Sequence, residues 1–318
     1  MIISFGFIIT GFVALIFGAN WLVNGASALA KQYKISDLAI GLTIVAFGTS
    51  APELIVNSVA SYNGHSDIVL GNIIGSNNFN LFIILGIAGL VYPISVQSST
   101  ARREIPISLG VTLVFLLLAN NFFIFGDLKV SRVDGAILFA SFLAFLYYVS
   151  KKMKVEEGPV TPASEKKSNL KIWTLIVLGL LGLLIGGKLV VDNAVLVATD
   201  MGVSQKIIGL TIIAAGTSLP ELVTSIIAAV KKNSDIAIGN VIGSNIFNLL
   251  LILPISAFIR PIDFSQNFNQ DILILFGGKV FLILAMITGK RRKLDRWESG
   301  LLLGFYLVYT GYLVSKEL

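Results

Sequence analysis

Two hexapeptides of the chain bring together the kinds of oxygen that bind small cations. They are Gly-Thr-Ser-Ala-Pro-Glu at Gly48–Glu53 and Gly-Thr-Ser-Leu-Pro-Glu at Gly216–Glu221. The threonine and the glutamate of each motif are four residues apart, which places a hydroxyl and a carboxylate on one face of a regular helix. The proline lacks an N–H, so it frees the carbonyl of Gly48 or Gly216 and favours an opened helix. Carboxylate, hydroxyl and carbonyl oxygens are hard ligands suited to Na⁺ and Ca²⁺.

A polar stripe follows each hexapeptide along the chain. Its members recur every four residues, which predicts a polar face on an otherwise apolar helix. Neighbouring glycines form small-xxx-small pairs that let helix backbones approach closely. The stripes are Asn72, Ser76 and Asn80, and Asn240, Ser244 and Asn248, with glycine pairs Gly71/Gly75 and Gly239/Gly243. They could serve hydrogen bonds between helices, cation binding, or both.

The elements that must position these residues are membrane-spanning helices. Of the 318 residues, 55% are hydrophobic and only 13% are charged, far more apolar than a soluble domain requires. About 20 apolar residues are needed to cross the hydrocarbon core, and loops with charge, Gly or Pro mark off ten such runs. We therefore predict an all-α polytopic membrane protein. The ten predicted spans are Ile2–Ala30, Leu38–Tyr62, Ile68–Tyr92, Ile105–Phe123, Val133–Ser150, Ile172–Val197, Ile207–Val230, Ile236–Ile259, Ile272–Thr288 and Gly300–Val314.

Each glutamate motif also has a purely structural interpretation. The proline would kink the helix for packing, and the glutamate would be buried in a protonated or ion-paired form. A charged side chain at the middle of a membrane span costs roughly 2.5–3.5 kcal/mol on insertion scales. Two symmetric carboxylates without a compensating use are hard to reconcile with that cost. The pair therefore favours cation binding by Glu53 and Glu221.

The chain contains an internal repeat. Sliding the sequence by 168 residues aligns Ser36–Leu85 with Ser204–Leu253 without a gap, and 28 of 50 positions are identical. We predict a first repeat at 1–150, a linker at 151–171 and a second repeat at 172–318. Because each repeat has five spans, an odd number, the second enters the membrane with the opposite orientation. Inverted repeats that meet at a shared site are typical of secondary transporters, although some channels also have them.

The distribution of basic residues predicts the orientation in the membrane. The net charge is +6, but the lysines and arginines lie in short loops and form no single basic face, so no nucleic-acid partner is expected. One side of the predicted membrane holds 17 of the 24 basic residues and the other holds five. By the positive-inside rule, the 151–171 linker is cytoplasmic and both termini lie outside the cytoplasm. The absence of cysteine excludes disulfides and cysteine metal sites.

The motifs resemble those of the calcium/cation antiporter superfamily, and within it the prokaryotic type of sodium/calcium exchanger. The matching segments are Gly48–Glu53 with Gly71–Asn80, and Gly216–Glu221 with Gly239–Asn248. The resemblance implies a secondary antiporter of a prokaryotic cell membrane that exchanges Na⁺ for Ca²⁺ by alternating access, electrogenically, as its first and sixth helices slide across a fixed bundle. Its expected partners are these two transported ions and the lipid bilayer. Neither enzyme activity nor a cofactor is expected.

The resemblance also implies a set of metal ligands. Glu53 and Glu221 would hold Ca²⁺ alternately with Na⁺, together with carbonyls and hydroxyls of Thr49 and Thr217. Asn80 and Asn248 stand where some relatives carry Asp, so a potassium site is not expected. The groups that would complete flanking Na⁺ sites are Ser50, Ser218, Ser76, Ser244 and the carbonyls of Ala46 and Ala214.

Two other functions stay open on the sequence. In a Ca²⁺/H⁺ antiporter, the two glutamates would carry protons. Proton-coupled relatives usually have a Gly-Asn-x-x-Glu core where this chain has Gly-Thr-Ser-x-Pro-Glu, which favours sodium. A passive cation channel could use the same oxygen ligands, but it could not move Ca²⁺ uphill when a Na⁺ gradient is imposed.

The predicted topology can be tested by labelling. Cysteines introduced singly at Ser164, in the linker, and at Lys316, near the C-terminus, should react with a membrane-impermeant thiol reagent from opposite sides of the membrane. The chain has no cysteine of its own, so the background is zero. Labelling of both positions from the same side would end the inverted-repeat interpretation.

Overall fold

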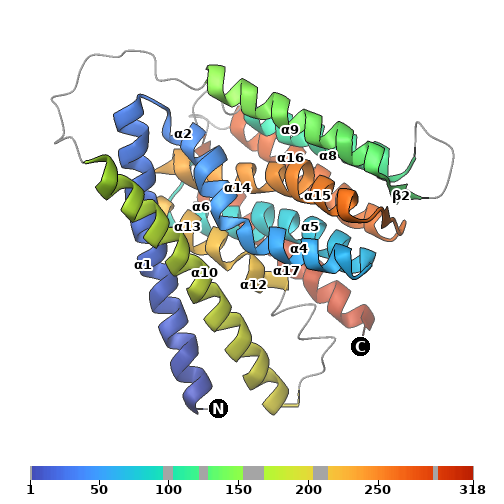
Figure 1. Ribbon diagram of the computed structural model, residues 1–318, viewed down its shortest axis with the longest axis horizontal. Helices are drawn as coiled ribbons and strands as arrows, with labels where there is room; N and C mark the ends of the chain where they lie inside the picture. Colours follow the sequence, from blue (N-terminus) through green and yellow to red (C-terminus); the bar gives the residue numbers. More distant parts are fainter. Residues whose placement is uncertain are drawn as a thin grey trace.

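The computed structural model describes residues 2–95, 103–121, 128–152, 168–202, 214–288 and 293–317. Within these ranges the protein is a bundle of helices with two short pairs of strands (Figure 1). The prediction of an all-α fold is confirmed. Of the 151–171 linker, residues 153–167 lie outside the described residues.

Helices of the first half follow the first five predicted spans. The second and third spans are composite, because each contains a π-helical segment, η1 or η2. The elements are α1 (Ile2–Tyr33), α2 (Asp37–Ile40), η1 (Gly41–Val45), α3 (Ala46–Thr49), α4 (Ala51–Tyr62), α5 (Ser66–Asn78), η2 (Phe79–Ile84), α6 (Leu85–Val91), α8 (Glu104–Ala119) and α9 (Arg132–Lys152).

Helices of the second half repeat this order. The start of the seventh predicted span, 207–213, lies outside the described residues. The elements are α10 (Asn169–Asp200), α12 (Ala214–Thr217), α13 (Leu219–Val230), α14 (Ser234–Phe247), η4 (Asn248–Ile252), α15 (Leu253–Ile259), α16 (Phe268–Thr288) and α17 (Arg296–Glu317).

Six helices of the described residues are long and apolar enough to cross a membrane by length and composition. The bent pair Asp37–Thr49 and Ala51–Tyr62 makes a seventh if it counts as one span. Three further predicted spans coincide with α8, with α12 and α13, and with α17, whose described helices are shorter or less apolar. The structure is that of a membrane protein, and the number ten stays a prediction consistent with it.

Both Gly-Thr-Ser-x-Pro-Glu motifs interrupt their helices. α3 ends at Thr49 and α4 begins at Ala51, and the helix axis bends by 48° across this break. Ser50 (φ −83°, ψ 10°) and its repeat partner Ser218 (φ −91°, ψ 9°) occupy equivalent non-helical positions. The predicted opening of the helix at these motifs is confirmed.

Each break creates a helix N-terminus inside the bundle. Pro52 and Pro220 lie in the first turn of α4 and α13, where a missing N–H leaves no helical bond unmade. Glu53 and Glu221 lie in the same turns. The partial positive charge of a helix N-terminus stabilises a nearby carboxylate, so each break supports its glutamate inside the bundle.

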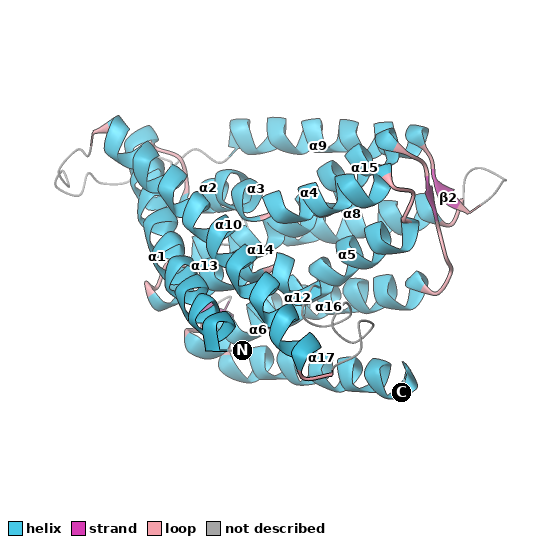
Figure 2. Ribbon diagram, turned by 60° about the horizontal axis from the view of Figure 1, so that its bottom comes forward, coloured by secondary structure: helices cyan, strands magenta, loops and turns pink. Residues whose placement is uncertain are grey.

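The two halves are interleaved rather than packed as separate bodies. Strand β1 (Ile94–Ser95) pairs with β4 (Lys293–Leu294), and β2 (Lys129–Val130) pairs with β3 (Ile262–Asp263), so each pair joins one strand from each half. Likewise α6 packs on α17, and α9 packs on α15 along one edge of the bundle (Figure 2). The helices of the two ranges therefore share one fold, and the division into repeats at 1–150 and 172–318 stays a prediction.

Two arginine side chains also join the halves, one in each direction. Arg132 Nε donates to the carbonyl of Phe258 at 3.2 Å, and Arg296 Nε donates to the carbonyl of Leu90 at 3.1 Å. The acceptors Leu90 and Phe258 are 168 residues apart, the shift that aligns the repeats, whereas the two arginines are 164 residues apart. The two halves therefore make similar local contacts, although their helices interleave.

Glycines allow α14 to lie directly against the second predicted span. A Cβ at Gly239 would lie 3.0 Å from Gly41 Cα, and one at Gly243 would lie 2.7 Å from Ala46 Cβ. The close approach expected of this glycine pair is confirmed. Residues 203–213, the repeat equivalents of 35–45, lie outside the described residues, so the Gly71/Gly75 pair stays a prediction.

The long helices α1 and α10 lie side by side at one edge of the bundle (Figure 1). Their contact depends on glycine. A Cβ at Gly18 would lie 2.8 Å from both Gly179 O and Leu183 N, and a Cβ at Gly179 would lie 2.6 Å from Leu22 N. These are backbone atoms that no rotamer change can move aside, so the two helices touch along their main chains.

Replacing Gly18 by Val should separate α1 from α10. We expect a loss of about 1–3 kcal/mol, the usual cost of overpacking, seen as a lower midpoint of thermal unfolding of the protein in detergent. Gly6→Val is the matched control, because the Cβ at Gly6 meets nothing within 4 Å. Equal midpoints for the two variants would contradict this account of the contact.

Candidate cation site

Two hydrogen bonds cross between the halves at the broken helices. Oγ of Ser50 donates to Oε1 of Glu221 at 2.8 Å, and Oγ of Ser218 donates to Oε1 of Glu53 at 3.0 Å. The two bonds are equivalent under the repeat. Each carboxylate is therefore held by a serine of the other half, and the two motifs meet at a single site.

The carboxylates of this site are buried and incompletely satisfied. Glu53 is 1% exposed and Glu221 is 0% exposed. The second oxygen of each, Oε2, has no hydrogen-bond partner among the described residues. Burying a polar group without a partner is costly, and burying a charge without compensation is more so. The arrangement has the two properties of a cation site, negative charge and unoccupied oxygens.

Hydroxyls extend the site along α5 and α14. Ser244 Oγ donates to Glu221 Oε1 at 3.4 Å, and Ser218 Oγ lies within hydrogen-bond distance, 3.2 Å, of Ser76 Oγ. Ser244 of the polar stripe thus contacts a carboxylate directly, and Ser76 of the other stripe is linked to Glu53 through Ser218. The predicted serines of the flanking sites are brought together.

The two threonines bind the polar stripe of the opposite half. Thr49 Oγ1 donates to Asn240 Oδ1 at 3.1 Å, whereas Thr217 Oγ1 accepts from Asn72 Nδ2 at 3.3 Å. The pairs are equivalent by position but opposite in the direction of the hydrogen bond. Both threonines lie at the breaks, one residue before the serine that bonds a carboxylate.

Two ligands expected from the resemblance are carbonyls. The carbonyl of Ala46 accepts a hydrogen bond from Ser50 N at 3.0 Å, and Thr49 Oγ1, whose hydrogen goes to Asn240 Oδ1, lies 3.3 Å from it. One of its two lone pairs is therefore engaged in this conformation. Its counterpart Ala214 is the first residue of α12, and its side chain lies outside what the structure describes.

Asn57 and Ser225 belong to the hydrogen-bond network around the two glutamates, and neither was predicted from the sequence as a site residue. Asn57 Nδ2 donates to the carbonyl of Glu53 and to Asn72 Oδ1, both at 2.7 Å. In the other half, Asn240 Nδ2 donates to the carbonyl of Glu221 at 3.2 Å and to Ser225 Oγ at 3.0 Å. Asn57 and Ser225 each follow their glutamate by four residues, a helical spacing that could have identified them.

Asn80 and Asn248 lie next to the serines, in η2 and η4. Their amide nitrogens donate to Asn245 Oδ1 at 3.1 Å and Asn77 Oδ1 at 3.3 Å, and their own Oδ1 atoms are buried without a partner among the described residues. Among the described residues, no cluster of three or more His, Cys, Asp or Glu side chains could hold a metal ion. A cation at this site would therefore take most of its ligands from neutral oxygens, as Na⁺ and Ca²⁺ do more readily than transition metals.

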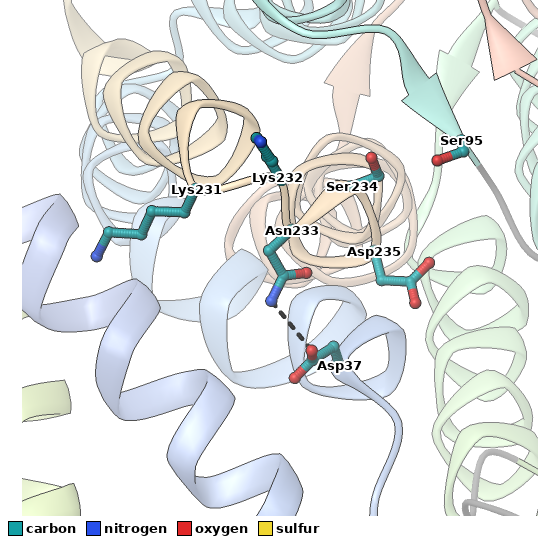
Figure 3. A pocket seen from close by; sticks show the side chains of 7 residues that line it. All are labelled: Asp37, Ser95, Lys231, Lys232, Asn233, Ser234 and Asp235. Carbon is teal, nitrogen blue, oxygen red and sulfur yellow. Dashed lines mark hydrogen bonds between the residues drawn. The ribbon is translucent and has the colours of Figure 1, made fainter.

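A separate polar pocket lies at the N-terminal end of α14 (Figure 3). It is lined by Asp37, Ser95, Lys231, Lys232, Asn233, Ser234 and Asp235. Asn233 Nδ2 donates to Asp37 Oδ2 at 3.0 Å, which ties the start of α14 to the start of α2. Ser234 and the site residue Ser244 are ten residues apart on α14, about 15 Å at helical rise. The pocket is therefore distinct from the carboxylate site.

The sequence is similar to those of known membrane exchangers and antiporters. A family model described as sodium/calcium exchanger protein matches residues 3–151 and 171–315. The chain is 37% identical over 328 residues to the putative antiporter CaxA of Alkalimonas amylolytica, covering 99% of this chain and 100% of that protein. It is 31% identical over 345 residues to the sodium/calcium exchanger MaX1 of Methanosarcina acetivorans, covering 96% and 97%.

Solved structures agree with the sequence matches. The fold superimposes on the sodium-calcium exchanger NCX_Mj with a TM-score of 0.84, at 30% sequence identity and over 98% of both chains. That protein was solved after soaking with Na⁺ and Ca²⁺. The matched residues include both hexapeptides and both polar stripes. The chain therefore belongs to the sodium/calcium exchanger family.

Proposed function

We propose that this protein is a membrane antiporter that exchanges Na⁺ for Ca²⁺ at the site between Glu53 and Glu221. One observation carries the proposal: two buried carboxylates, one from each inverted half, are each bonded to a serine of the other half and each keep one oxygen unpartnered. A pair of carboxylates in a low-dielectric interior requires positive charge to balance it. Either one Ca²⁺ or two Na⁺ supply that charge.

The same geometry accounts for alternation between the two ions. Ca²⁺ would take the central position, with oxygens of Glu53, Glu221, Thr49 and Thr217. Na⁺ would share these carboxylates and use the neutral groups on either side. Those groups are Ser50, Ser76, Asn80, Ser218, Ser244, Asn248 and the carbonyls of Ala214 and of Ala46, the last once its hydrogen bond is released. Since both ions need the same two carboxylates, Na⁺ and Ca²⁺ cannot bind the site at the same time.

Inverted repeats supply the means of alternating access. Two halves of opposite orientation can exchange an outward-open for an inward-open arrangement around a site on their pseudo-two-fold axis. Helices α1 and α10 contact each other along glycine-rich backbones and lie at the edge of the bundle, which suits a pair that slides over a fixed bundle. We place both termini outside the cytoplasm and the 151–171 linker inside it.

A Ca²⁺/H⁺ antiporter is the second candidate. The unpartnered Oε2 atoms of Glu53 and Glu221 could carry protons instead of meeting Na⁺. The hydroxyl and amide oxygens around them favour Na⁺, because a proton needs no such shell. A pH gradient that drives Ca²⁺ uptake in the absence of Na⁺ would select this alternative.

We expect purified protein in proteoliposomes to accumulate radiolabelled Ca²⁺ when a Na⁺ gradient is imposed, and to do so without K⁺. Glu53→Gln and Glu221→Gln should each lower the initial rate at least about 100-fold, because one carboxylate leaves a divalent ion uncompensated in a buried site. Both variants should still fold, with midpoints of thermal unfolding no lower than wild type in ion-free buffer, since each removes a buried charge.

Asn78→Leu is the matched control for these variants. Asn78 is buried on the same bundle, and its amide donates to the carbonyl of Asp271 rather than to a site residue. It should transport at the wild-type rate. Exchange at wild-type rate in either glutamine variant would remove the assignment, and Ca²⁺ entry that only follows its own gradient would make the protein a channel.

Exchange should also depend on membrane voltage. Three Na⁺ for each Ca²⁺ move one net positive charge per cycle, which is worth about 2.3 kcal/mol per 100 mV. The sign and size of the membrane potential, set with valinomycin and K⁺, should therefore change the rate and the final extent of Na⁺-driven Ca²⁺ uptake. If neither responds to the potential, the exchange is electroneutral and the stoichiometry is two to one.

A further inference from the structure

Four asparagines join the two central helices beside the carboxylate site. Asn77 and Asn80 lie at the junction of α5 with η2, and Asn245 and Asn248 lie at the junction of α14 with η4. None is more than 1% exposed. Each of the two site residues, Asn80 and Asn248, donates its amide nitrogen to an asparagine of the other half.

The orientation of the Asn245 amide is fixed by the main chain. Its Nδ2 donates to the backbone carbonyl of Asn77 at 3.3 Å. A carbonyl can only accept, so the nitrogen of Asn245 must face it and the oxygen must face the other way. That oxygen is the atom that Asn80 meets at 3.1 Å.

Asn80 inherits its orientation from this bond. Because Asn245 presents an acceptor, Asn80 must present its nitrogen, and its own Oδ1 is turned away from Asn245. This oxygen is buried and has no hydrogen-bond partner among the described residues. Leaving a buried acceptor unsatisfied costs free energy unless a cation or a donor meets it.

The unpartnered oxygen belongs to the carboxylate site by its neighbours. Asn80 follows Ser76 by four residues, and Ser76 lies 3.2 Å from the serine that donates to Glu53. Asn245 directly follows Ser244, whose hydroxyl donates to Glu221. Asn80 and Asn245 therefore lie on the same helices as these two serines, and they make no hydrogen bond to a carboxylate among the described residues.

We propose that Asn245 is a positioning residue that holds the Oδ1 of Asn80 toward bound Na⁺ and so sets the sodium affinity of the site. The inference rests on the proposed function. A neutral amide oxygen adds no charge, so it serves a monovalent ion that shares the two carboxylates better than it serves Ca²⁺. Without the acceptor at Asn245, the Asn80 amide can rotate and present its nitrogen to the cation, which repels it.

The test is a double-mutant cycle on Asn245 and Asn80. Wild type, Asn245→Leu, Asn80→Ala and the double variant are compared by the Na⁺ concentration that gives half-maximal Na⁺-driven Ca²⁺ uptake in proteoliposomes. We expect Asn245→Leu to raise that concentration about fivefold or more, while the half-saturating Ca²⁺ concentration changes less than twofold. The double variant should be no worse than Asn80→Ala alone, because Asn245 acts through Asn80.

Two further variants separate positioning from packing. Asn78→Leu removes a buried amide of the same size that donates to the carbonyl of Asp271, and it should keep the wild-type Na⁺ dependence. Asn245→Asp keeps an oxygen acceptor facing Asn80, so its half-saturating Na⁺ concentration should stay at or below that of wild type. It also supplies a measurable variant if Asn245→Leu does not fold. Additive effects in the cycle, or a rise for Asn245→Asp as large as that expected for Asn245→Leu, would overturn the proposal.

A second readout is independent of transport. Na⁺ that binds the folded protein raises its midpoint of thermal unfolding in a concentration-dependent way. The same variants can be titrated with Na⁺ in detergent, and the same order of half-saturation is expected. If wild type binds Na⁺ but shows no Na⁺-driven Ca²⁺ uptake, the proposed function fails while the role of Asn245 is still decided by this titration.

Discussion

The burial of Glu53 and Glu221 at the meeting of the two halves is the constraint on which the rest of the structure depends. Two carboxylates in a low-dielectric interior repel each other and lose their hydration. The fold answers with a helix N-terminus at each glutamate and a serine donor from the opposite half. In the proposed function, a bound cation supplies the positive charge that these groups do not.

This constraint explains why the helices are broken where they are. An unbroken helix would satisfy its own carbonyls and would carry Ser50 and Ser218 on regular turns. The prolines prevent that, and the serines at the breaks reach across to the other half's carboxylate. Strand pairs and arginine contacts also join the two halves. The two serine–glutamate contacts are therefore related by the same repeat that relates the two motifs.

The symmetry is incomplete in a way that matters chemically. The carbonyl of Glu53 is bonded by Asn57, from its own helix, whereas the carbonyl of Glu221 is bonded by Asn240, from the neighbouring helix. As a result Asn72 turns its nitrogen to Thr217, and Asn240 turns its oxygen to Thr49. The first repeat has Asn57 where the second has Ser225, and the hydrogen bonds at the equivalent threonines Thr49 and Thr217 run in opposite directions.

Sequence alone determined the helical class, because apolar runs long enough to span a membrane can be read from the local chain. It also determined the repeat with its 168-residue offset and the residue types of the site. It located the breaks through Pro52 and Pro220. Only the tertiary structure decided that Ser50 bonds Glu221 rather than Glu53, that the halves interleave, and that Asn245 orients Asn80. Those contacts join residues more than 160 positions apart, and their geometry follows from how the helices pack, which no local pattern encodes.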